Sequence, residues 1–125
     1  MLTDSDVLVL HTRGNVAAAR RLNAIAQWQI SVVTYMELAQ GCSDKSNLDR
    51  LKKGLAVRQV QVLHITPAIS QRAADLVDAL ALSHGMRLAD ALIAATAIEH
   101  RIPLLTGNLK HFSPITNLTV EAFVR

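Results

Sequence analysis

The segment from Leu88 to Ile98 is apolar around its whole circumference when it is read as a helix, and this limits the folds open to the chain. It reads LADALIAATAI, and Asp90 is the only charged residue between Arg87 and Glu99. A helix without a polar face has to be buried on all sides. A chain of 125 residues has the length of one domain. We therefore expect residues 1–125 to form a single domain around this helix.

Short β-branched segments alternate with helical patterns through most of the chain. Strands are predicted at residues 2–3, 29–33, 60–65, 102–106 and 118–123. Helices are predicted at residues 17–26, 34–40, 48–55, 67–84 and 88–98. This alternation favours an α/β fold, an α/β/α sandwich in which helices flank a mostly parallel central sheet.

Several helix ends carry their own signals. Thr66 followed by Pro67 predicts a cap and a first helical residue, and Gly85 predicts the end of that helix. The segment 34–37 has the form of a capping box and predicts a helix that begins there. The apolar run 7–10 fits a strand or a helix, and in the helical interpretation Ser5 or Asp6 would be its cap.

Composition excludes several classes of protein. The net charge of +3 gives a mild preference for polyanions, and only four aromatic residues argue against a reader that stacks on exposed bases. Cys42 is the single cysteine, and the five histidines have no metal-ligand spacing, so we expect each to be a surface or packed residue. No window offers the roughly 18 apolar residues of a membrane span. An acidic start does not resemble a signal peptide, so we expect a cytoplasmic protein.

Side chains with oxygen atoms follow the predicted strands at the points where these strands end. The carboxyl ends of parallel strands meet at one edge of a sheet, and ligands bind there. The side chains that this topology brings toward that edge are Asp4, Asp6, Glu37, Asp90, Thr106 and Asn108.

Three of these four acids also have a purely structural interpretation. Asp90 suits the first turn of a helix because of the helix dipole, and the capping box by itself explains Glu37. Asp6 fits a plain helix cap, whereas Asp4, which precedes that cap, has no capping role left. Helix capping does not require all four acids to lie at one edge of the sheet, so their shared position favours a functional site.

Carboxylates that crowd together need a cation, because like charges a few ångströms apart repel. Oxygen ligands favour Mg²⁺ or Mn²⁺, which also bind phosphate oxygens. The chemistry that suits such a site is phosphodiester hydrolysis. The positive net charge would then hold a nucleic-acid backbone around the acids.

Four segments resemble, in the same order, the motifs of PIN-domain ribonucleases: 4–8, 31–41, 90–97 and 104–112. The size resembles that of the VapC toxins of bacterial type II toxin–antitoxin systems. The resemblance implies an endoribonuclease that depends on Mg²⁺ or Mn²⁺. It also implies a homodimer, an antitoxin protein that blocks the site, and a helix at residues 7–13.

The same resemblance implies roles for individual residues. Asp4, Glu37 and Asp90 would be the acidic core, supported by Asp6 and Thr106. Many members carry a fourth acid on the closing turn, where this chain has Asn108. Asparagine can bind a metal through its carbonyl oxygen but adds no charge, which argues against a second metal ion.

Three alternatives stay open at this point. The segment 4–6 also resembles the nucleophile motif of haloacid-dehalogenase-type phosphatases, although the late acidic pair of those enzymes is missing. A response-regulator receiver has this length, but Asp49 lies in a Lys-rich helix instead of ending a strand. Asn108 leaves room for a binding module that kept the fold and lost the chemistry.

Overall fold

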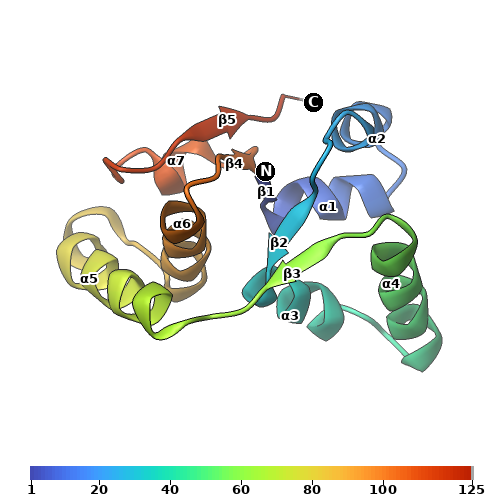
Figure 1. The fold of residues 1–125 in the computed structure, drawn as a ribbon, viewed down its shortest axis with the longest axis horizontal. Coiled ribbons are helices and arrows are strands. Elements are labelled where there is room, and N and C mark those ends of the chain that lie inside the picture. Colours follow the sequence, from blue (N-terminus) through green and yellow to red (C-terminus); the bar gives the residue numbers. More distant parts are fainter. Residues whose placement is uncertain (125) are drawn as a thin grey trace.

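A sheet in which every neighbouring pair of strands is parallel runs through the centre of the protein (Figure 1). The computed structural model describes residues 1–124. The strands of this part are β1 (Leu2–Thr3), β2 (Gln29–Ser31), β3 (Gln61–Leu63), β4 (Leu104–Thr106) and β5 (Val120–Ala122). The helices are α1 (Ser5–Thr12), α2 (Val16–Asn23), α3 (Val32–Gln40), α4 (Lys45–Val57), α5 (Pro67–His84), α6 (Leu88–His100) and α7 (Leu109–Phe112).

The order of the strands in the sheet is β3-β2-β1-β4-β5. The chain runs outward from β1 through β2 to β3 and then continues on the other side of β1 with β4 and β5. Leu2 accordingly pairs with Gln29 on one side and with Leu104 on the other. In open α/β sheets, ligands bind beyond the carboxyl ends of the strands at such a reversal, and here the reversal lies between β1 and β4.

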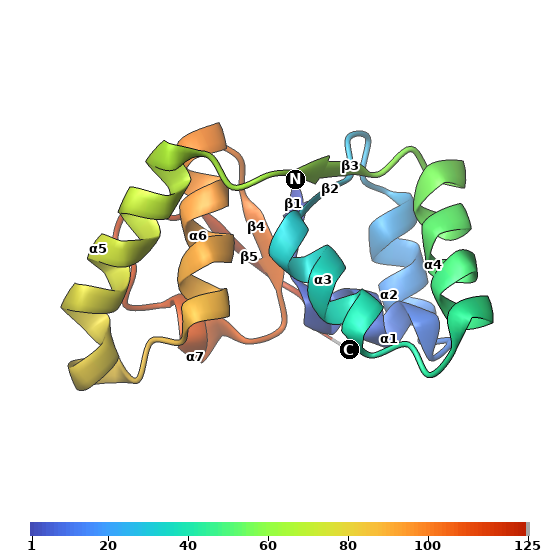
Figure 2. The same ribbon diagram turned by 90° about the horizontal axis from the view of Figure 1, so that it is seen from below.

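Helices cover both faces of the sheet. Leu104 and Leu105 are consecutive in β4 and fully buried, and they belong to two different hydrophobic clusters because side chains alternate along a strand. The cluster around Leu104 includes residues of α5, α6 and α7, and the cluster around Leu105 includes residues of α1 and α2. Figure 2 shows α5 and α6 side by side, and α1 to α4 gathered across the strands. The predicted α/β/α sandwich is confirmed, and its sheet is entirely parallel.

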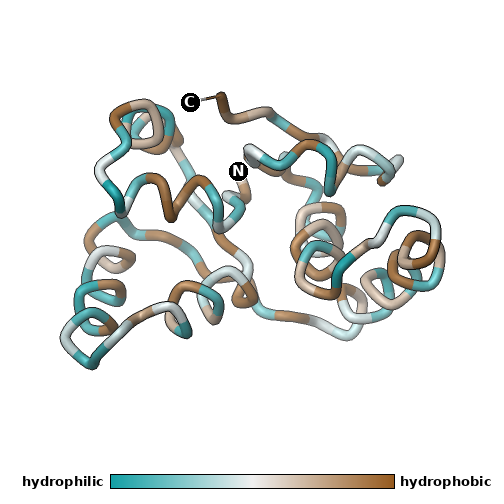
Figure 3. Tube along the Cα trace, turned by 180° about the vertical axis from the view of Figure 1, so that it is seen from behind, coloured by the Kyte–Doolittle hydropathy of each residue, from teal (hydrophilic) through white to brown (hydrophobic). Residues whose placement is uncertain are grey.

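The apolar helix lies where its composition predicts. Six residues of α6 from Ala91 to Ala97 are at most 1% exposed, and Ile69 and Ala73 of α5 are buried against the same cluster. By contrast, α4 has no buried residue, and hydrophilic colours dominate along it in Figure 3. None of the helices in the described part of the chain has the length and apolar character needed to span a bilayer.

The cap of α1 differs from the prediction. The helix begins at Ser5 and Asp4 is its N-cap, with Asp4 Oδ1 accepting a hydrogen bond from the Ser5 backbone at 2.8 Å. The expectation that Ser5 or Asp6 caps this helix, which would leave Asp4 without a capping role, is therefore wrong. β1 ends at Thr3, so Asp4 is the first residue after the strand and takes the N-cap position of α1. The helical interpretation of residues 7–13 is correct, with α1 ending at Thr12.

The capping box predicted at residues 34–37 is also absent. β2 ends at Ser31, and the Ser31 hydroxyl caps α3 by accepting a hydrogen bond from Val33 N at 3.1 Å. Thr34 then lies inside the helix, where its buried hydroxyl has no hydrogen-bond partner among the described residues. Serine is a strong N-cap, and it lies three residues earlier than the box. The signals around α5 are confirmed, since Thr66 caps it and Gly85 ends it at a φ of 65°.

Candidate active site

Asp4 joins the carboxyl ends of the two central strands. It follows β1 directly, is 4% exposed, and its Oδ2 accepts a hydrogen bond from the Thr106 hydroxyl at 2.8 Å. Thr106 is the last residue of β4, the strand that pairs with β1. The backbone N–H of Asn108 donates to the Thr106 hydroxyl oxygen at 3.0 Å, so the turn after β4 helps to orient this contact. The predicted proximity of Asp4, Thr106 and Asn108 is present.

Asp6 is attached to the same turn. Its Oδ2 accepts a hydrogen bond from Gly107 N at 2.9 Å, and its Oδ1 accepts one from Val7 N at 2.8 Å. A Cβ atom at position 107 would lie 2.7 Å from Asp6 Oδ2, so only glycine allows this approach. Gly107 is a residue that the sequence analysis did not single out. Its only sequence signal was its position directly after the strand and Thr106.

Burial and like charges act together on Asp4. Burial, and secondarily the negative charge of Asp6, raise the pKa of Asp4 to about 6. The hydrogen bonds from Thr106 and Ser5 favour the ionised form and oppose this rise, while the charge of Asp90 adds to it. A carboxylate in such surroundings gains stability from a nearby cation.

Asp90 lies in the first turn of α6, with its side chain 17% exposed. Burial raises its pKa, and the charges of His111 and Arg87 act in the opposite direction. His111 Nδ1, on α7, lies 3.4 Å from Asp90 Oδ2 and forms an ion pair when the imidazole is protonated. His111 is an exposed surface residue, as expected, and it also lies beside the site. α7, which brings it there, was not predicted.

Glu37 projects from α3 and is the most exposed of the predicted carboxylates. Partial burial and the charge of Asp90 raise its pKa, whereas the Ser5 hydroxyl lowers it. Because α3 begins at Val32, Glu37 has no role in a capping box. The capping interpretation of Glu37, which competed with a functional one, is therefore excluded.

The acids therefore approach one another without enclosing a metal site. Hydrogen bonds connect Asp4 and Asp6 to the turn after β4, and charge interactions relate Asp90 to both Asp4 and Glu37. Across residues 1–124, no three His, Cys, Asp or Glu side chains converge closely enough to hold an ion by themselves. The donor set consists of carboxylate and hydroxyl oxygens, and it fits a cation that keeps part of its water shell, as Mg²⁺ does.

Comparisons with known proteins agree with this fold. The model of the PIN domain family matches residues 1–115. Ribonuclease VapC10 of Mycobacterium tuberculosis is 37% identical over 119 residues, which cover 90% of this chain and 85% of that protein.

Solved structures agree as well. A toxin–antitoxin complex from Klebsiella pneumoniae contains a chain that is 28% identical, with a TM-score of 0.83 and coverage of 99% of this chain and 98% of that one. A chain of VapBC2 from Rickettsia felis, solved with a promoter DNA fragment, has the same fold, with a TM-score of 0.82, 20% identity and 98% coverage of both chains. From its motifs, its parallel sheet and these matches, the chain belongs to the PIN domain family.

Proposed function

We propose that this protein is a VapC-type endoribonuclease that depends on a divalent metal ion, Mg²⁺ or Mn²⁺. Asp4, Glu37 and Asp90 would bind the ion, with Asp6, Thr106 and Asn108 in support. The observation that carries the proposal is the buried position of Asp4 close to other negative charges. Its carboxylate is buried where β1 ends beside β4, and this burial, followed by the charges of Asp6 and Asp90, raises its pKa. The 37% identity to a ribonuclease supports RNA as the substrate.

A divalent ion bound there would polarise a phosphate oxygen and lower the pKa of the attacking water. The chain itself orients the carboxylates. Thr106 and Ser5 hold the Asp4 carboxylate in place, and Gly107 holds Asp6. Arg87 and His111 lie close enough to Asp90 to affect its pKa, and Arg87 supplies a positive charge for the RNA backbone beside the acids.

The proposal includes protein partners. The Klebsiella pneumoniae structure is a toxin–antitoxin complex, and its matching chain is 28% identical. Asp4, Asp6, Glu37 and Asp90 together are called the acidic edge. We propose that an antitoxin covers the acidic edge and inserts an arginine, whose planar fork pairs with carboxylates in two directions. A homodimer and a cytoplasmic location belong to the same proposal.

The second candidate is a binding module with the PIN fold and weak catalysis, which Asn108 favours because it adds no charge to the acids. Membership of the PIN domain family leaves the phosphatase and receiver alternatives without support. Cleavage of RNA by the purified protein separates the two remaining candidates.

The test compares RNA cleavage by the wild type, Asp90→Ala and Asp49→Asn, with Mg²⁺ or Mn²⁺ and with EDTA. Asp49 is an exposed acid on α4 and serves as the control. We expect cleavage with metal and none with EDTA, and a loss of activity by a factor of hundreds or more in Asp90→Ala. Equal activity of wild type and Asp90→Ala would reject the proposal.

The toxin role has its own test in bacteria. Expression of the protein alone should slow growth, and co-expression of the neighbouring gene should restore it. Normal growth together with the absence of any co-purifying partner would contradict the toxin assignment while leaving the nuclease assignment to the cleavage assay.

A further inference from the structure

A cavity of about 360 Å³ lies directly beside the acidic edge, between α1 and the segments that follow β4 and β5. Its lining includes Asp6, Val9, Leu10, Arg13, Asn108 and Phe123. The volume is near the lower end of the range for small-molecule pockets, roughly 300–1,000 Å³. It suits a single nucleotide better than a folded segment of protein.

One face of α1 lines this cavity along its length. Positions 6, 9, 10 and 13 follow the spacing i, i+3, i+4 and i+7, which places their side chains on the same side of a helix. At 1.5 Å per residue, the step from Asp6 to Arg13 extends roughly 10 Å along α1. The cavity therefore begins at the acids and leads away from them.

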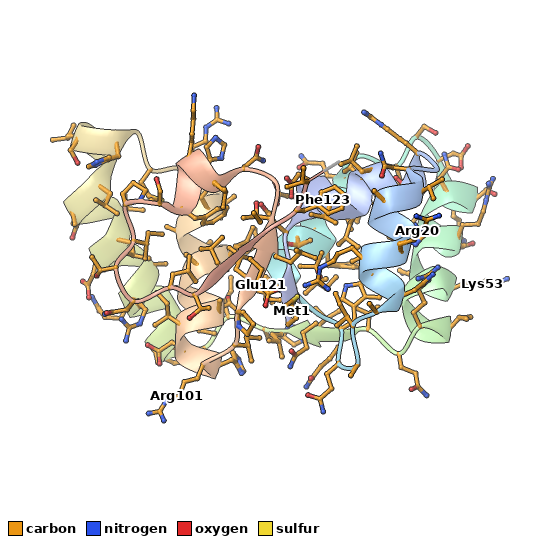
Figure 4. All side chains as sticks on the ribbon, turned by 90° about the horizontal axis from the view of Figure 1, so that it is seen from above. Met1, Arg20, Lys53, Arg101, Glu121 and Phe123 are labelled. Carbon is orange, nitrogen blue, oxygen red and sulfur yellow. The ribbon has the colours of Figure 1, made fainter. Side chains whose placement is uncertain are left out.

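The chemistry of the lining changes along this direction. Asp6 and Asn108 lie at the end next to the acidic edge, and the middle is apolar, with Phe123 in the hydrophobic cluster that α1 covers. Figure 4 shows Phe123 beside α1. Arg13, an exposed residue that caps the C-terminal end of α1, supplies a positive charge at the far end.

We propose that this cavity binds the nucleotide of a single-stranded RNA that adjoins the scissile phosphate. Arg13 would contact the phosphate on the far side of that nucleotide, because a guanidinium fork matches phosphate oxygens. Val9, Leu10 and Phe123 would contact the sugar and the base. The inference rests on the proposed function, since it treats the acidic edge as the place of cleavage.

Asn108 gains a role in this arrangement. An acid at this position would place a further negative charge at the mouth of the cavity and would repel the phosphate that has to pass it. An amide has no charge and still offers two donors and an acceptor. The residue that departs from the family pattern is thus compatible with a path for RNA across this edge.

The test uses Arg13→Ala and Val9→Trp, which remove the charge and fill the cavity, respectively. Lys53→Ala is the control, because Lys53 projects from the outer side of α4, far from the cavity (Figure 4). Two experiments use the same short single-stranded RNA. The first measures kcat and KM for cleavage with Mn²⁺, and the second measures binding affinity in EDTA at several salt concentrations. Thermal melts confirm that each variant is folded.

We expect Arg13→Ala to raise KM roughly tenfold with kcat within about twofold of wild type, because uniform binding is lost. The slope of log affinity against log salt should become shallower by about 0.7, the value for one phosphate contact on a single strand. Val9→Trp should raise KM as well, and Lys53→Ala should match wild type.

Wild-type KM and an unchanged salt slope in both cavity variants would overturn the subsite while leaving the nuclease proposal intact. Variants that bind RNA normally but lose binding of the antitoxin would assign the cavity to that protein and also overturn it. If wild type cleaves no RNA with any metal, the proposed function fails and the subsite fails with it.

Discussion

The acidic edge has two halves that the fold holds in different ways. Asp4 and Asp6 belong to the short connection between β1 and α1, and hydrogen bonds of 2.8 to 2.9 Å tie them to Thr106 and Gly107. Asp90 and Glu37 project from α6 and α3, are more exposed than Asp4, and interact with the other acids through their charges. Asp90 Oδ2 lies 3.4 Å from His111 Nδ1.

Asp4 and Asp6 therefore form a prearranged half of the acidic edge, and Asp90 and Glu37 form an adaptable half. The hydrogen bonds of Asp4 and Asp6 span about 100 residues of sequence, and they set the position of these carboxylates before any ligand binds. Asp90 and Glu37 are more exposed, and we expect them to adjust when a cation binds. We expect substitutions in the first half to alter the stability and its pH dependence as well as the chemistry, and substitutions in the second half to act mainly on the chemistry.

The largest effect is expected for Asp4→Asn. The amide oxygen can still cap α1, and the variant loses a charge whose burial is unfavourable, so the metal-free protein should be as stable as wild type or more stable at neutral pH. RNA cleavage should fall by a factor of hundreds or more. The measurement is a cleavage assay beside a thermal melt, with Asp49→Asn as the control. A stable variant that keeps normal activity would remove Asp4 from the site.

The pH dependence of stability tests the same half without a mutation. The pKa of Asp4 in the folded protein, about 6, lies above its ordinary value of 3.8, so the folded state binds a proton more tightly than the unfolded state does. Ionisation of Asp4 should therefore reduce the free energy of unfolding as the pH rises from about 4 to above 6, by on the order of 3 kcal/mol.

Burial raises the pKa of Glu37 and Asp90 in the same direction. Denaturant unfolding in EDTA at several pH values measures the combined effect. Wild type should lose stability over this interval, and Asp4→Asn should lose much less of it. A wild-type protein that becomes more stable as the pH rises from 4 to 7 in EDTA would contradict the assignment.

Glu37→Gln examines the adaptable half. Because Ser31 and not Thr34 caps α3, this change should leave the metal-free melting temperature unchanged or slightly higher. Cleavage should fall by roughly tenfold or more, and the rise in melting temperature produced by Mn²⁺ should shrink, since stabilisation by a ligand follows its affinity. A variant that retains both full activity and the full Mn²⁺ shift would exclude Glu37 from metal binding.

The smallest effect is expected for Gly107→Ala. The added Cβ would approach Asp6 Oδ2 to 2.7 Å, so the carboxylate has to move and its hydrogen bond from Gly107 N weakens. We expect a loss of about 1–2 kcal/mol in the free energy of unfolding, measured with denaturant. Gly54→Ala on α4 is the control, because a Cβ there meets no atom within 4 Å in the described structure. Equal stability of wild type and Gly107→Ala would show that Asp6 is not held by this contact.

The sequence predicts the layers of this fold well, because they depend on local periodicity. A few neighbouring residues are enough to recognise each local signal. These signals are the apolar circumference of α6, the cap and proline at Thr66 and Pro67, and the helix end at Gly85. The edge at which the acids meet follows from strand direction alone. The candidate acids could therefore be named before their contacts were known.

The contacts themselves could not be predicted in this way. Ser31 and Thr34 both offer caps for α3, and the choice depends on where β2 loses its pairing with β3. The approach of Gly107 to Asp6 joins residues 101 positions apart. His111 reaches Asp90 from α7, a helix of four residues that carries too little periodicity to be recognised.

The central claim is that both halves of the acidic edge share one divalent cation. The most direct measurement is the melting temperature of wild type, Asp4→Asn and Glu37→Gln at pH 7 over a titration of Mn²⁺. Wild type should be stabilised in a saturable manner, and each variant should show a smaller or weaker response, because each removes one charge that would face the ion. An absence of any Mn²⁺ effect on wild type, or equal responses of all three proteins, would contradict the account.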